Sequence, residues 1–243
     1  MENMLGVIGG MGPMASCLFY EMITRKTEAS KDQDHTNIMI LSHATMPDRT
    51  AVMFGSDSSD AEELLLEDCR SLEAAGCKAI CVACNTAHYF LHRFEDRLGI
   101  PVISMIREGA AFMGRAHRGQ KVAILGTDGT VRSGLYQDAF RSEGVNPYTP
   151  GPDVQKIIMH VIYERVKAGL SPEPEAVSTI TEDVRKAGCA AALIACTELS
   201  IMKSTEGLGT FYIDAMELMA ERAIEFMGKK LKKQEVYQRE YHT

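Results

Sequence analysis

The chain has 243 residues, of which 45% are hydrophobic and 24% are charged, proportions typical of a folded globular protein and not of a disordered one. Its formal net charge of -7 argues against nucleic acid as the main partner, because a phosphate-binding surface needs an excess of Lys and Arg. No apolar run approaches the roughly 20 residues that cross a bilayer, and residues 1–5 lack a basic segment typical of a signal peptide. Seven cysteines is an odd number, so we expect reduced thiols in a cytoplasmic protein with no membrane partner.

The first half of the chain alternates apolar runs with helical patterns. In order, it predicts a strand at 5–9, a glycine-rich turn at 10–13 with a helix after it, a strand at 36–41, a polar loop at 47–50, a helix from about 60 to 76, a strand that runs into Cys84, a helix that reaches 97, and a strand at 101–103.

The second half repeats this alternation. In order, it predicts a strand at 121–127, a helix at 134–143, a helical segment at 152–168, a helix at 173–187, a strand that runs into Cys196, a strand at 211–213, a helix from Asp214 to about 227, and a charged tail or fraying helix from 229. Strands that alternate with helices predict parallel α/β sheets, one in each half.

One motif occurs twice. The frame Ala-Gly-Cys-x-Ala-x-x-x-Ala-Cys spans residues 75–84 and again residues 187–196, at an offset of 112. Each copy places a cysteine, Cys84 or Cys196, where an apolar run meets polar residues that can begin a helix. Ligands of parallel sheets bind at such strand ends, and a helix N-terminus lowers a thiol pKa and attracts carboxylates. We therefore expect the two thiols to face one substrate.

Other interpretations of these segments are weaker. Cys81 and Cys84 fit Cys-x-x-Cys, but a redox pair belongs at a helix start, outside the strand, and without a second such pair a zinc site is not expected. Residues 10–15 satisfy a loose dinucleotide-binding pattern, yet the second strand ends in Ser-His and offers no acidic residue for a ribose. Cys77 and Cys189 have the sequence context of core residues, as does Cys81.

Five short motifs carry a resemblance to a known family. They are Gly-Gly-Met-Gly-Pro at 9–13, Asp-Gln-Asp-His at 32–35, Pro-Asp-Arg-Thr-Ala at 47–51, Cys-Asn-Thr-Ala-His at 84–88 and Cys-Thr-Glu at 196–198. Together they resemble the aspartate racemases of the aspartate/glutamate racemase superfamily, in the right order over nearly the whole chain. The resemblance implies a two-lobed, pseudo-symmetric α/β fold with the active site in the cleft, often dimeric, that needs neither pyridoxal phosphate nor a metal.

Two positions distinguish this chain within the family pattern. Ala195 precedes the second cysteine where the family usually has Gly. Glu198 stands where glutamate racemases usually carry His, which favours the aspartate branch. The resemblance also implies one lobe of residues 1–104 plus 212–243 with the first catalytic cysteine, and a second lobe of residues 105–211 with the other.

Racemisation removes a proton from one face of Cα and delivers another to the opposite face, which two opposed acid/base groups can do. We expect Cys84 and Cys196 to be this pair. Donors are also needed around the substrate carboxylate and the developing charge, and the polar residues beside the cysteines and strand ends suit this: Asn85, Thr86, Thr127 and Thr197. By resemblance, Arg49 and Lys167 bind the side-chain carboxylate, with Met11 lining the pocket. Glu198 and His88 are candidates for tuning the thiols.

The leading hypothesis is a cofactor-independent aspartate racemase that acts on a small dicarboxylic amino acid and forms a homodimer. A glutamate or broad-specificity racemase is the nearest alternative. Relatives with the same cysteine frame that decarboxylate malonates or isomerise maleate give an alternative from another reaction class. An amino-acid-binding protein without activity is disfavoured, because binding alone gives no reason for two matched thiols.

Overall fold

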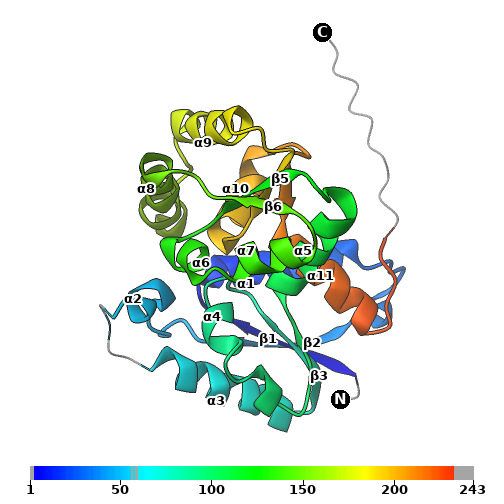
Figure 1. Ribbon diagram of the computed structural model, residues 1–243. Helices are drawn as coiled ribbons and strands as arrows, with labels where there is room; N and C mark the ends of the chain where they lie inside the picture. Colours follow the sequence, from blue (N-terminus) through cyan, green and yellow to red (C-terminus); the bar gives the residue numbers. More distant parts are fainter. Residues whose placement is uncertain (1–2, 56, 58–59, 233–243) are drawn as a thin grey trace.

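A computed structural model describes residues 3–55, 57 and 60–232, and this part of the chain forms two four-stranded parallel sheets (Figure 1). The strand orders, β2-β1-β3-β4 and β6-β5-β7-β8, are the same in both halves. The strands are β1 Met4–Gly9, β2 Asn37–Ser42, β3 Cys77–Val82, β4 Val102–Ile103, β5 Lys121–Leu125, β6 Asn146–Tyr148, β7 Ala191–Ile194 and β8 Tyr212–Asp214. The predicted α/β fold with two related halves is confirmed.

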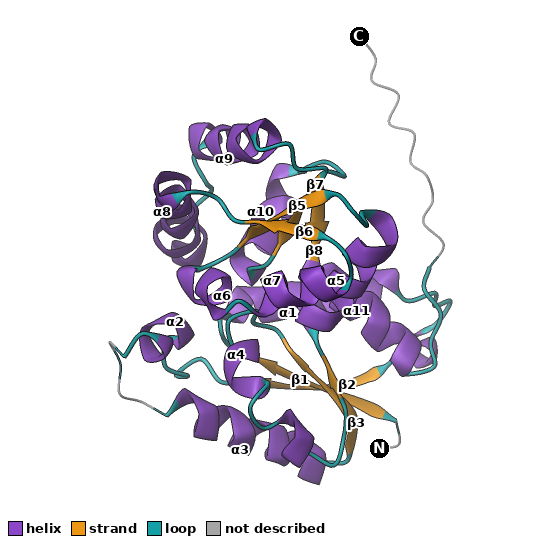
Figure 2. Ribbon diagram, in the orientation of Figure 1, coloured by secondary structure: helices purple, strands orange, loops and turns teal. Residues whose placement is uncertain are grey.

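Helices form a layer between the two sheets and cover their outer faces (Figure 2). The middle layer contains α1 Pro13–Lys26, α5 Met105–Ala116, α7 Leu135–Ser142 and α11 Ala215–Phe226. The outer face of the first sheet packs on α3 Ala61–Ala74 and α4 His88–Leu91. The outer face of the second sheet packs on α8 Pro152–His160, α9 Pro174–Lys186 and α10 Thr197–Glu206.

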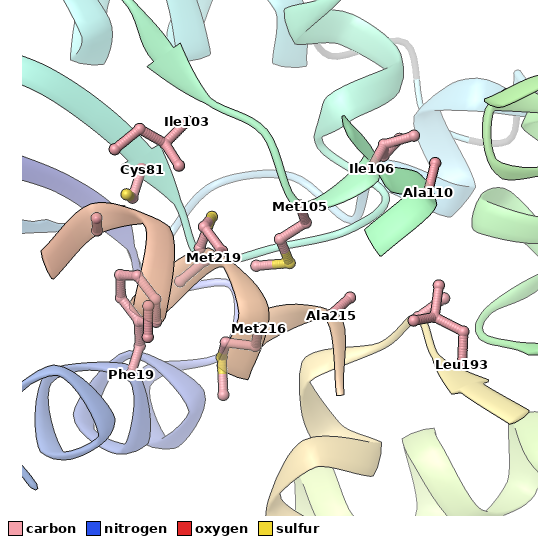
Figure 3. Close-up of a cluster of buried hydrophobic side chains, with 14 of the residues drawn as sticks. Phe19, Cys81, Ile103, Met105, Ile106, Ala110, Leu193, Ala215, Met216 and Met219 are labelled. Atoms are coloured by element: carbon pink, nitrogen blue, oxygen red, sulfur yellow. The ribbon is translucent and has the colours of Figure 1, made fainter. Parts of the chain in front are cut away.

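The core follows the alternation of side chains along each strand. Leu5 and Val7 of β1 belong to the cluster that includes the middle helices, whereas Met4 and Ile8 belong to the cluster with α3. The strands are apolar on both faces because helices cover both. Figure 3 shows the middle cluster, where side chains of α1, α5 and α11 meet those of β3, β4 and β7. One apolar layer therefore holds the two sheets together.

Four elements of the structure were not predicted. Arg49–Met53 forms a short helix, α2, where the sequence indicated a polar loop at 47–50, because the Asp48 side chain caps it by accepting a hydrogen bond from the Ala51 N–H at 2.9 Å. The other three are α5, whose helical pattern is weakened by two glycines, the short α6 Asp128–Ser133, and β6, an edge strand with a central proline.

Other predicted helices differ in form. The helix expected to reach residue 97 is α4 followed by a separate 3-10 turn, Glu95–Arg97. The helical segment predicted at 152–168 continues from α8 into a π-helical segment, Val161–Arg165, and a 3-10 turn, Val166–Ala168. The remaining predicted strands and helices are confirmed with small shifts at their ends.

The division of the chain into two lobes remains a proposal. The proposed boundary returns the chain to the first lobe at residue 212. The hydrogen bonds between β7 and β8 instead join β8, residues 212–214, to the sheet of the second half.

The predicted charged tail begins at Lys229. From Lys229 to Lys232 the chain runs beside the end of α1, where the Glu28 N–H donates to the Lys230 carbonyl at 2.8 Å, and it is not helical there. The remainder of the predicted tail, 233–243, lies outside the described residues.

The middle layer should carry much of the stability. Met216 on α11 is fully buried in it, so Met216→Ala should lower the free energy of unfolding by about 2–5 kcal/mol. Met14 on α1 is 69% exposed, and Met14→Ala should change it by no more than about 0.5 kcal/mol. Urea unfolding of the two variants and the unchanged protein makes the comparison, and equal losses would contradict the assignment of the core.

Candidate active site

The two cysteines follow directly after equivalent strands. The Ala83 N–H donates to the carbonyl of Ile8 at 2.9 Å, and the Ala195 N–H donates to that of Leu125 at 2.7 Å, so each central pair of strands separates one residue before a cysteine. Cys84 and Cys196 are each 5% exposed. The duplicated sequence frame thus produces the same local geometry in both halves, and both thiols lie at carboxyl ends of strands.

A single cavity brings together all ten residues predicted for the site. Its lining includes Met11, Arg49, Cys84, Asn85, Thr86, Thr127, Lys167, Cys196, Thr197 and Glu198. Three lining residues were not predicted as site residues: Asp48, Thr50 and Tyr163. Asp48 and Thr50 flank Arg49 in a motif already singled out, and Tyr163 precedes Lys167 by four residues, the spacing of neighbours on a helical face. These two signals were available in the sequence.

Cys196 lies beside a carboxylate. Its Sγ donates to Glu198 Oε2 at 3.0 Å, and Thr197 Oγ1 donates to the same oxygen at 3.3 Å. Burial raises the pKa of Cys196 well above its usual value, and the negative charge of Glu198 raises it further. The expectation that a helix N-terminus would lower this pKa is therefore wrong for Cys196, although the residue does stand at the start of α10. It is a thiol at neutral pH.

Cys84 lies instead beside a buried cation, Arg49. Burial lowers the pKa of Arg49, but the Cys84 sulfur and the Asp48 carboxylate outweigh this effect and raise it. The guanidinium donates to backbone carbonyls of both neighbouring segments, those of Pro47 at 2.8 Å and Met11 at 3.4 Å. A charged Arg49 is thus fixed beside the first cysteine, whereas a carboxylate, Glu198, lies beside the second.

Three threonine hydroxyls form a cluster that joins the two halves. Thr86 Oγ1 lies 2.9 Å from that of Thr127 and 3.0 Å from that of Thr130. Thr127 also caps α6, accepting from the Thr130 N–H at 3.2 Å. Gly129 permits this approach, because a Cβ there would lie only 2.7 Å from both Thr50 Oγ1 and Thr86 Cγ2. Thr86 and Thr127 of this cluster also line the cavity.

A second set of contacts between the halves involves Asp48. It accepts from Tyr163 OH at 3.0 Å, and Lys167 Nζ lies 3.7 Å from the same oxygen. Burial raises the pKa of Asp48, but the Ala51 N–H and the charges of Lys167 and Arg49 outweigh this effect and lower it. Asp48 is thus ionised, and it holds the π-helical segment of the second half against the Arg49 segment of the first.

The glycine-rich turn supplies Met11 to the cavity. Gly10 has φ +86°, and a Cβ on it would lie 2.5 Å from the backbone carbon of His43, so only glycine fits. Its N–H donates to Ser16 Oγ of α1 at 2.9 Å. Met11 is buried, and its carbonyl accepts from Arg49. The conformation of this turn therefore fixes one wall of the site.

Each cysteine carbonyl is contacted by the residue four positions later. His88 Nδ1 donates to the Cys84 carbonyl at 2.9 Å, and its Nε2 accepts from the Met105 N–H at 3.3 Å. Burial lowers the pKa of His88 to about 4, so the ring is neutral. In the second half Ser200 Oγ lies 3.5 Å from the Cys196 carbonyl and donates to Asp214 Oδ1 at 2.8 Å. His88 is thus a buried support for the cysteine loop.

The described residues contain no group of three His, Cys, Asp or Glu side chains arranged to hold a metal ion. Within the same ranges, no helix is long and apolar enough to cross a membrane.

Two duplicated parallel sheets that present one cysteine each to a shared cavity define a two-lobed α/β scaffold for acid/base chemistry. The chain matches the family model for Asp/Glu/Hydantoin racemase over residues 8–223, and it belongs to that family.

Individual relatives extend this finding. The solved structure of a Picrophilus torridus aspartate racemase superposes with a TM-score of 0.79 at 30% identity, covering 95% of this chain and 96% of that one. RacX, a broad specificity amino-acid racemase of Bacillus subtilis (strain 168), is 27% identical over 147 residues, 58% of this chain. A glutamate racemase of Oceanobacillus iheyensis is 29% identical over 133 residues, 53% of this chain. The chain spans 62% and 47% of the lengths of these two curated relatives.

The environment of Cys196 makes a testable prediction. In Glu198→Gln the negative charge beside Sγ is lost, so the pKa of Cys196 should fall toward its usual value and its alkylation should begin at lower pH. Iodoacetamide labelling of the Cys196 peptide, followed by mass spectrometry across a pH series, measures this shift. Glu206→Gln, at the exposed end of the same helix, is the matched control. An unchanged profile in Glu198→Gln would assign the raised pKa to burial alone.

Proposed function

We propose that this protein is a cofactor-independent aspartate racemase that interconverts L- and D-aspartate with Cys84 and Cys196 as its two acid/base groups. The observation that carries the proposal is the convergence of both cysteines, from equivalent strand ends of the two halves, on one small cavity lined by cations and hydroxyls. Two opposed groups can exchange the Cα proton without turning the substrate over.

The different surroundings of the cysteines suggest their roles. Cys196, held by Glu198, is the thiol that donates a proton to Cα. Cys84, beside the Arg49 guanidinium, is the base that removes one. When Cys84 takes the Cα proton, the electron pair of that C–H bond remains on the carbanion until the Cys196 proton forms the new C–H bond on the other face. The products are the opposite enantiomer, a Cys84 thiol and a Cys196 thiolate, ready for the reverse direction.

Two groups of residues are assigned to the two carboxylates. Asn85, Thr86, Thr127 and Thr197 surround the carboxylate next to Cα, where the carbanion charge develops, and their donors stabilise it. Arg49 and Lys167 bind the distal carboxylate, with Met11 as an apolar wall. Glu198 orients the Cys196 thiol. The chemistry consists of proton transfers, so the proposal includes no cofactor.

Aspartate is favoured over glutamate by the likeness to the Picrophilus torridus aspartate racemase. One methylene is worth only about 1 to 3 kcal/mol of discrimination, and the relatives include a broad-specificity and a glutamate racemase. A glutamate or broad-specificity racemase is therefore the second candidate. A homodimer, implied by the family resemblance, and a cytoplasmic location, inferred from the seven cysteines, complete the proposal.

The two-cysteine mechanism is tested by incubating the reduced protein with L-aspartate in deuterated water and following the Cα proton signal and D-aspartate together. Cys84→Ser and Cys196→Ser should each lower racemisation by roughly 100- to 10,000-fold, the usual contribution of an acid/base group. Cys17→Ser, at an exposed cysteine on α1, should leave the rate unchanged. Full turnover by either active-site variant, with its circular dichroism unchanged, would exclude the mechanism. Exchange only with glutamate or maleate would favour an alternative substrate.

The role of Arg49 is tested by comparing substrates. Arg49→Met keeps much of the side-chain volume but removes the charge, so kcat/KM for aspartate should fall roughly 10- to 100-fold, as for other hydrogen bonds to charged groups. The rate with alanine should fall less, because alanine lacks the distal carboxylate and loses only the effect of Arg49 on Cys84. Lys167→Met makes the same comparison for the second cation that lines the cavity. Equal losses with aspartate and alanine would show that Arg49 acts on Cys84 and not on the distal carboxylate.

A further inference from the structure

The carboxamide of Asn85 has one end bonded and one end without a partner. Its Oδ1 accepts a hydrogen bond from Tyr136 OH at 2.6 Å. Its Nδ2 is buried and makes no hydrogen bond to the described residues. Asn85 is 4% exposed and lines the cavity between the two cysteines. Since the oxygen is turned to Tyr136, the NH₂ group is the end of the amide left for a ligand in that cavity.

The direction of the Tyr136 bond decides which end of the amide faces the cavity. An asparagine amide can accept at its oxygen and donate at its nitrogen, and a protonated tyrosine hydroxyl matches the oxygen. Burial raises the pKa of Tyr136 well above its usual value, and the charge of Asp214 adds to this, so the hydroxyl keeps its proton. If the amide were reversed, its oxygen would face the cavity and repel a carboxylate.

The position of Tyr136 is itself fixed by packing. It lies near the start of α7, in the second half of the chain, and is fully buried. Its ring makes an edge contact with Phe140, with centroids 6.1 Å apart. On another side it packs against Gly109 of α5, where an added Cβ would lie 3.4 Å from the ring. The hydroxyl therefore reaches Asn85 from a rigid place in the middle layer.

We propose that Tyr136 is a positioning residue that holds the Asn85 carboxamide with its NH₂ group directed into the cavity, as a donor for a substrate carboxylate. The inference rests on the proposed function for the identity of the substrate, but its geometry requires only a carboxylate in the cavity. A residue of the second half thereby orients a binding group beside the cysteine of the first. Tyr136 acts through Asn85, since it is not itself among the described residues that line the cavity.

The experiment is a double-mutant cycle with Tyr136→Phe, Asn85→Ala and the two together. Tyr136→Phe should lower kcat/KM for aspartate roughly 10-fold, because the amide loses its fixed orientation. If Tyr136 acts through Asn85, adding Tyr136→Phe to Asn85→Ala should change kcat/KM by less than about 2-fold. Tyr212→Phe is the matched control: it removes a buried hydroxyl that lies 2.5 Å from Thr181 Oγ1, and it should leave kcat/KM unchanged.

A binding measurement separates this inference from the proposed function. Succinate carries two carboxylates but has no stereocentre to racemise, and calorimetry gives its Kd for the native chain and for each variant. Tyr136→Phe should raise that Kd roughly 10-fold, and the increase should disappear in the Asn85→Ala background. A native chain that racemises nothing but shows this Tyr136-dependent binding would contradict the proposed function and support the positioning role.

Three results would overturn the positioning role. One is that Tyr136→Phe behaves like Tyr212→Phe in both kcat/KM and succinate Kd. Another is that the losses from Tyr136→Phe and Asn85→Ala multiply in the double variant, which indicates that the two residues act independently. The third is that the native chain neither racemises aspartate nor binds succinate, in which case no carboxylate reaches Asn85 and both proposals fail.

Discussion

The site depends on where two strands part from their neighbours. The last backbone hydrogen bonds of these pairs, from Ala83 and Ala195, hold the chain to β1 and β5 until one residue before each cysteine. Both sheets have the same strand order, so the strands separate in the same way before each cysteine. Both cysteines line one cavity. The apolar middle layer then sets how far apart these two edges lie, because helices of that layer pack on both sheets.

The duplication holds for the backbone but not for the charges. Cys84 has a guanidinium beside it, and Cys196 has a carboxylate, while the supports behind them are a neutral imidazole and a hydroxyl that reaches a buried carboxyl. The repeated fold therefore places the two cysteines at equivalent backbone positions. The side chains around them differ, so the two thiols have chemically different surroundings. For a reaction that needs one group charged and the other protonated, this difference is useful.

Much of this arrangement was predictable from the sequence, because the repeated cysteine frame and the strand-helix alternation depend on local patterns. The ten predicted residues do line one cavity, although their roles stay predictions. Helix α5 was missed because its glycines weaken the helical pattern, and its stability comes from packing in the middle layer. Tyr136 and the burial of His88 were beyond sequence reasoning, since each depends on contacts between segments far apart in the chain. The raised pKa of Cys196 likewise follows from burial, which local sequence does not reveal.

The two halves meet through two kinds of contact with different physical properties. At the cavity they meet through hydrogen bonds and an ion pair, among them Thr86 with Thr127 and Asp48 with Tyr163 and Lys167. In the middle layer they meet through buried apolar side chains. Parting the polar contacts exchanges them for hydrogen bonds to water at a small net cost, whereas parting the middle layer would expose apolar surface. Separating the two halves at the cavity would therefore cost less free energy than separating them at the middle layer.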